Sequence, residues 1–189
     1  MGGDQTIRNH PDIELYAEGS EKEIEIISNY LITNNFPYKE INDEQIEVLE
    51  STILLSKYSS WDTSHLFDIH NNNLVFFPRV MSYSNSNDFQ IMFWLKTNNI
   101  KGHYYFRKKT GIEKIIDIMR NDDEFKFKDF EIFTIKSSIY RTQILSVLKT
   151  FQDIKNIEIE IHNDNLYIKT VDAPTLDNFK ILFKQIKTL

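Results

Sequence analysis

The last third of the chain contains the run of elements that most constrains the fold. Alternating apolar residues predict a strand over residues 130–135 and a hairpin over 156–169. Apolar residues spaced three and four apart predict amphipathic helices over 138–151 and 175–187. A one-sided helix needs an apolar sheet face to cover, so the order strand–helix–hairpin–helix predicts an α+β architecture.

The side chains of the hairpin also select its register. With Asn163-Asp164 as a two-residue turn, the predicted pairs are Ile161 with Leu166, Ile159 with Ile168, and Glu158 with Lys169. The isoleucines then share one face, and Glu158 and Lys169 form a favourable cross-strand pair on the outer face. A slip of one residue would expose the isoleucines to water and lose the charge pair.

The centre of the chain predicts an antiparallel β-meander, with strands over residues 64–69, 74–83, 89–96 and 103–107. In the third strand the apolar residues on one face are Phe89, Ile91, Phe93 and Leu95, and those on the other are Met92 and Trp94. Apolar residues on both faces indicate a central strand covered twice, or a strand that offers one face to a partner. Pro78 cannot donate to a strand ladder, so the second strand is expected at an edge or with a bulge.

Residues 1–60 are expected to form an N-terminal segment packed on a main domain of residues 61–189. The segment is predicted to contain a strand over 13–17, a helix that starts at a capping box formed by Ser20 and Glu23, and a second helix over 43–57. Another capping box, at Thr110, predicts a helix over 110–120 that leads into the C-terminal run.

Composition narrows the classes of function. The 189 residues include no cysteine, which excludes disulfides, thiol catalysis and cysteine-ligated metal centres. The formal charge of −6 repels phosphate backbones on average, so nucleic acid is not the expected partner. The sequence contains no apolar stretch long enough to span a bilayer, and its N-terminus is polar, so the expected location is the cytoplasm.

The run of residues 129–135, the helix that ends near Leu148, the hairpin over 157–168 and the closing helix resemble the soluble C-terminal part of a group of uncharacterised bacterial proteins. The resemblance covers about residues 74–189 and rests on the order of elements. It implies a bacterial protein with this α+β fold, and it carries over no catalytic residue because no activity is established for the group. Members often have two membrane helices before the soluble part, and this chain contains none.

One segment has the residue types of a metal site. Asp68 and His70 would lie on one face of a strand, and Asp62 could approach from the preceding loop. These three residues could support a metal-assisted hydrolase. The alternative is a polar outer face on an edge strand, because only two of the potential ligands are in phase.

Residues 101–109 combine basic and aromatic side chains on one strand. Tyr105, Arg107, Lys108 and Lys109 could stack on bases and neutralise phosphates. The same residues could instead guard an edge strand, which the acidic charge of the chain favours. For a protein partner, the predicted contacts are Trp94, Tyr105, Arg107 and Lys108.

The expected function is therefore non-enzymatic. The sequence has no phosphate-binding glycine loop, no nucleophile elbow and no H-E-x-x-H motif, so neither a cofactor nor a catalytic residue is predicted. An acidic protein that binds or inhibits a basic protein partner, as an immunity protein does, fits these properties, as does a subunit of a larger assembly. The metal-assisted hydrolase and the nucleic-acid-binding module are the two alternatives.

Overall fold

The computed structural model describes residues 11–69, 73–81, 87–97, 100–108, 130–132 and 140–189. Its helices are α1 (Pro11–Thr33), α2 (Asp43–Glu50), α3 (Ile53–Ser56), α5 (Arg141–Thr150) and α6 (Leu176–Ile186). Its strands are β1 (Tyr38–Lys39), β2 (Ser60–Asp68), β3 (Leu74–Met81), β4 (Asn87–Phe89), β5 (Met92–Lys96), β6 (His103–Lys108), β7 (Phe130–Ile132), β8 (Ile157–His162) and β9 (Asn165–Thr170). The helix predicted over 110–120 lies outside the described residues.

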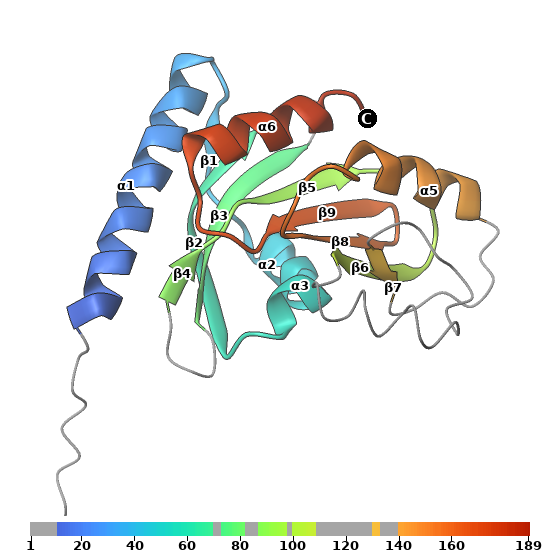
Figure 1. Ribbon diagram of the computed structural model, residues 1–189, viewed down its shortest axis with the longest axis horizontal. Coiled ribbons are helices and arrows are strands. Elements are labelled where there is room, and N and C mark those ends of the chain that lie inside the picture. Colours follow the sequence, from blue (N-terminus) through green and yellow to red (C-terminus); the bar gives the residue numbers. More distant parts are fainter. Residues whose placement is uncertain (1–10, 70–72, 82–86, 98–99, 109–129, 133–139) are drawn as a thin grey trace, which may run out of the picture.

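The strands form one antiparallel sheet, which confirms the predicted α+β class (Figure 1). Its order is β1-β2-β3-β5-β9-β8-β6-β7, and β4 pairs with β3 beside β5. Strands β2, β3 and β5 follow one another as a meander. The expected fourth neighbour, β6, is displaced, because the C-terminal hairpin β8–β9 is inserted between β5 and β6.

Each face of the sheet packs into its own core. One core joins apolar residues of α1, α5 and α6 to the sheet, and the other joins those of α2 and α3 to the opposite face. Phe93 contributes to the first core and Trp94 to the second, so β5 is the doubly covered central strand that its sequence indicated. Residues of the N-terminal segment, among them Ile27 and Leu31, share the first core with those of α6.

The C-terminal run has the predicted elements as far as the structure describes them: β7 starts the strand predicted over 130–135, and residues 133–135 lie outside the described part. The hairpin has the predicted register, including Glu158 opposite Lys169, and the turn residues Asn163 and Asp164 have positive φ values of 46° and 66°. Such φ values at both positions match a type I′ turn, whose twist suits a two-residue hairpin. One expectation was wrong: the face that bears Glu158 and Lys169 is not an outer face, because α3 covers it.

The start of the chain differs from the prediction. Residues 13–17 are helical within α1, and Ser20 lies in the interior of that helix instead of capping it. Pro11 suits a first helical turn, where a missing amide donor costs nothing, and acidic residues follow it there. Glu23, expected to close a capping box, instead accepts a hydrogen bond from the amide of Leu176 at 3.2 Å and thereby links α1 to the start of α6.

The strand expected over 89–96 is interrupted at Gln90 and Ile91, next to the proline of β3. Strand β3 is internal, so it is not the edge strand that Pro78 suggested. The register is irregular beside Pro78, but the extra residue lies between Thr63 and Leu66 of the neighbouring strand β2 and not in the strand that contains the proline. The carbonyl oxygen of Pro78 accepts a hydrogen bond from the amide of Gln90. The next amide, of Ile91, donates to the hydroxyl of Thr170 at 3.0 Å in a buried environment.

The Thr170 hydroxyl therefore accepts the hydrogen bond of the Ile91 amide, in place of a backbone carbonyl of the sheet. Replacing Thr170 by valine should lower the free energy of unfolding by about 1–3 kcal/mol, because it leaves a buried amide without an acceptor. Chemical denaturation measures this change. Thr170→Ser keeps the hydroxyl and should retain most of the stability; equal losses in the two variants would show that the methyl group, and not the hydrogen bond, matters.

Among the described residues, no helix is both long and apolar enough to cross a membrane.

Candidate functional site

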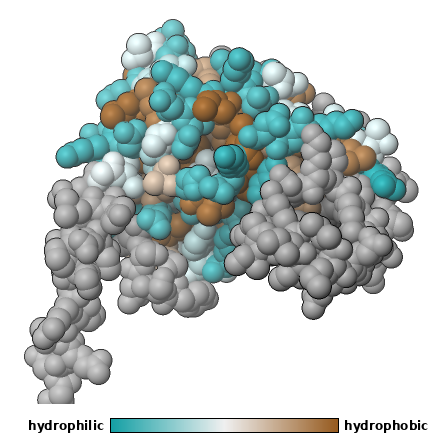
Figure 2. Space-filling view, viewed as in Figure 1, coloured by the Kyte–Doolittle hydropathy of each residue, from teal (hydrophilic) through white to brown (hydrophobic). Residues whose placement is uncertain are grey.

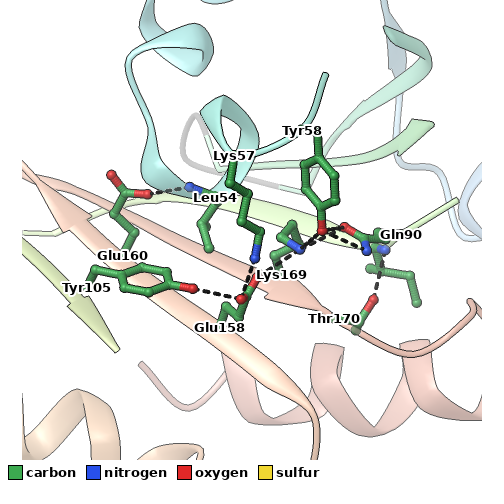
Figure 3. Close-up of polar contacts among 10 residues, drawn as sticks. Leu54, Lys57, Tyr58, Gln90, Tyr105, Glu158, Glu160, Lys169 and Thr170 are labelled. Atoms are coloured by element: carbon green, nitrogen blue, oxygen red, sulfur yellow. Dashed lines mark hydrogen bonds and ion pairs between the residues drawn. The ribbon is translucent and has the colours of Figure 1, made fainter. Parts of the chain in front are cut away.

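Charged and polar side chains lie buried between α3 and the sheet. Figure 3 shows these groups pointing toward one another from α3, the segment after it, and strands β6, β8 and β9. Lys169 and Glu160 have no exposed surface, and Glu158 is 5% exposed. Ionised groups are seldom buried to this extent unless they are paired, so each needs a partner within the protein.

Glu158 is the centre of the first group of contacts. Its carboxylate lies 2.9 Å from the ammonium of Lys169, also contacts the ammonium of Lys57, and accepts a hydrogen bond from the Tyr105 hydroxyl at 2.6 Å. Burial alone would raise the pKa of Glu158, but the charges of Lys169 and Lys57, with the hydrogen bonds from Lys57 and Tyr105, outweigh it and lower this pKa to about 2. Burial, and then the charge of Glu158, raise the pKa of Tyr105, so its hydroxyl remains a donor.

Lys169 connects this group to the strand interruption. Its ammonium donates to the Gln90 side-chain oxygen at 2.7 Å and to the Tyr58 hydroxyl at 3.0 Å. Burial lowers the pKa of Lys169, and the adjacent Glu158 opposes that shift. The ammonium of Lys169 is thus hydrogen-bonded to Gln90 and Tyr58 and ion-paired with Glu158.

Glu160 holds the start of α3 against the sheet. Its two carboxylate oxygens accept hydrogen bonds from the amides of Ile53 and Leu54, both at 3.0 Å. The single helix predicted over 43–57 is therefore wrong: it divides into α2, which begins at an Asn42 capping box, and α3. The break between the two helices is stabilised by the Glu160 carboxylate, which is more than a hundred residues away in the sequence. Local sequence patterns cannot reveal such a contact.

Two histidines lie at the rim of the buried cluster beside Glu160. His103 and His162 are directly paired across β6 and β8, and their rings stack with centroids 4.3 Å apart. A ring nitrogen of His103 lies 2.5 Å from Oε1 of Glu160, and the His103 side chain is 37% exposed. Burial lowers the pKa of His162, His103 lowers it further, and the charge of Glu160 opposes both effects.

The carboxylates of the sequence-predicted metal site do not converge. Asp62 is paired with Arg79 near one end of β2, and Asp68 is paired with Leu74 at the other end. Asp68 follows Asp62 by six positions along the strand, which corresponds to a separation of roughly 20 Å. Asp68 is bound to Lys39 at 2.5 Å, and His70 lies outside the described residues.

The four residues predicted to contact a partner do not form one exposed surface. Trp94 and Tyr105 are each only 7% exposed, and the Trp94 indole donates to Asn165 at 2.9 Å. Arg107 follows Tyr105 on the α3 side of the sheet, whereas the ammonium of Lys108 lies over the Phe130 ring and donates to the Gln152 carbonyl on the other side. Because Tyr105 is buried, it cannot stack on a base, and Lys109 lies outside the described residues.

Two hollows lined by described residues lie away from these side chains. A cavity of about 640 Å³ opens between α5, the end of α6 and the sheet, with Leu95, Val147 and Ile186 among its walls. Figure 2 shows hydrophobic and hydrophilic residues interspersed over the coloured part of the face that it presents. The exposed large apolar residues of the described chain are spread over several elements: Ile26, Ile32, Tyr38, Val48, Met81, Val171, Ile181 and Leu189.

Comparisons with protein-family models, with curated proteins and with solved structures find no match for this chain. The resemblance of residues 74–189 to a group of uncharacterised bacterial proteins thus stays a prediction.

Proposed function

We propose that the protein is a non-enzymatic binding protein that contacts a basic protein partner through the exposed acidic face of α2, which lies in its acidic N-terminal segment. The observation that carries the proposal is the separation of charge along the chain. Residues 1–60 hold twelve acidic and four basic residues, a net charge of −8, whereas the whole chain carries −6. Residues 61–189 therefore carry a slightly positive net charge of +2, and the excess of acidic over basic residues is confined to the N-terminal segment.

The exposed face of α2 concentrates this charge. Asp43, Glu44, Glu47 and Glu50 are all exposed, and the helix has no basic residue in its last turn. The macrodipole of a helix favours the first two carboxylates but disfavours Glu47 and Glu50, which lie in its C-terminal half. Local helix stability does not account for these two residues, whereas attraction to a positively charged partner does. Val48, 38% exposed among them, adds apolar contact area.

The buried ionisable groups support a binding role over a catalytic one. Lys169, Glu158 and Glu160 are engaged by their neighbours and by the backbone of α3, and they do not line either of the two hollows found among the described residues. Their contacts hold α3, and with it the adjoining α2, against the sheet. A rigidly held acidic helix suits an immunity-type inhibitor or an assembly subunit, and we propose a bacterial, cytoplasmic setting for it.

Neutralising α2 should abolish partner binding. In affinity purification from the source cells, the quadruple variant D43N/E44Q/E47Q/E50Q should lose a basic protein that the unchanged chain retains, and this binding should weaken as salt is raised. The control is E21Q/E25Q, which removes two exposed carboxylates from α1. The proposal would be contradicted if the unchanged chain, the quadruple variant and E21Q/E25Q all recovered the same proteins. It would also be contradicted if every recovered partner bound equally well at low and high salt.

A further inference from the structure

We propose that His103, Glu160 and His162 bind a divalent transition-metal ion of the zinc class. This site is independent of the acidic surface of α2. Each residue offers one ligand atom, and the three atoms lie within 4.8 Å of one another. They come from the directly paired strands β6 and β8, whose backbone positions are fixed by the sheet.

The side chains of His103, Glu160 and His162 can surround an ion by rotating, with no change in the backbone of the sheet. Metal–ligand distances of 2.0–2.2 Å place the ligand atoms of a tetrahedral site about 3.3 Å apart. The nitrogen of His103 and the oxygen of Glu160, now 2.5 Å apart, must separate slightly, and the third ligand atom already lies within 4.8 Å of both. The stacked rings have to tilt toward each other, which His103 can do because its side chain is more than a third exposed.

Glu160 is oriented as metal-ligating carboxylates commonly are. The amides of Ile53 and Leu54 fix its two oxygens from the side of α3, an arrangement that corresponds to the outer hydrogen bonds around a metal site. The ion would take the place of the direct contact between the His103 ring nitrogen and Oε1 of Glu160. Tyr167, paired with Glu160 across the hairpin, has a buried hydroxyl with no hydrogen-bond partner among the described residues.

The ligand types select the class of ion. Two imidazole nitrogens and one carboxylate suit zinc and its neighbours in the first transition series, whereas calcium and magnesium prefer oxygen ligands alone. Because His103 is partly exposed, solvent can occupy a fourth position. Such a site exchanges its ion with the medium.

Titration calorimetry of the chelator-treated full chain with zinc chloride tests the site. We expect one zinc ion per chain, affinity at least tenfold weaker in H103Q and in H162Q, and loss of this binding in the double variant. Cobalt(II), used as a spectroscopic substitute, should give visible absorption that the double variant lacks. His65→Gln, in β2, is the matched histidine control and should bind as the unchanged chain does.

Circular dichroism establishes that each variant is folded, and both histidines tolerate replacement because they lie at the rim of the cluster. Three outcomes would overturn the site. The first is no zinc binding by the unchanged chain, and the second is equal binding by the folded double variant. The third is zinc binding that is lost in D68A and kept in H103Q/H162Q, which would assign the ion to Asp68 and not to the histidine pair.

Discussion

Replacing Lys169 by methionine is expected to lower the free energy of unfolding by about 3–5 kcal/mol. Methionine fills the volume of the lysine stem, so the loss comes from removing the charge. Without it, the buried carboxylate of Glu158 loses its fully buried cationic partner and keeps its contact with Lys57, whose side chain is 35% exposed, and Gln90 and Tyr58 lose their donor. Urea denaturation followed by circular dichroism measures the change.

A double-mutant cycle separates the charge pair from simple packing. The double variant K169M/E158L removes both buried charges, so it should be destabilised by clearly less than the sum of the two single losses. Lys184→Met, at an exposed position of α6, should change stability by less than about 0.5 kcal/mol. Additive losses in the cycle would show that Lys169 and Glu158 do not depend on each other.

The C-terminal elements could be predicted because local patterns determine them. Each of Ile159, Ile161, Leu166 and Ile168 alternates with a polar or amphipathic neighbour, and a two-residue turn permits one register that keeps them together. The apolar stripes of α5 and α6 are likewise buried as their spacing indicates. In contrast, the alternation of apolar and polar residues over 13–17 is too short to distinguish a strand from a helix. The sequence contains no identifiable strand that would pair with it, and the segment is helical in the structure.

The candidate site depended on contacts that sequence patterns do not contain. The alternation of residues 157–162 placed Glu158, Glu160 and His162 on one face, which polarity alone assigned to solvent. That face is buried because α3 lies on it, and α3 is separate from α2 partly because Glu160 caps it. His103 reaches these residues only because the hairpin is inserted beside β6, and the expected meander put β6 next to β5 instead.

The pairing of Glu158 also predicts that the fold weakens in acid. The pKa of Glu158 is about 2 in the folded protein, and its ordinary value is 4.5. As the pH is lowered, Glu158 therefore takes up a proton in the unfolded chain near pH 4.5 but stays ionised in the folded protein until the pH approaches 2. The unfolded state then binds more protons, so stability falls as the pH decreases from about 4.5 toward 2. The full shift corresponds to about 3 kcal/mol, all of it present above pH 5 or so.

Comparison with Glu158→Gln isolates this effect from the titration of other carboxylates. Glutamine keeps an acceptor for Tyr105 but has no charge for Lys169 and Lys57, so the variant resembles the protein with protonated Glu158. Its stability deficit, measured by urea denaturation between pH 2 and pH 7, should be about 3 kcal/mol near neutrality and approach zero at pH 2. Glu44→Gln, exposed on α2, should show a small difference throughout this range. A deficit of Glu158→Gln that stays constant with pH would mean that the ion pairs of Glu158 do not stabilise the fold, and that the variant loses stability through packing alone.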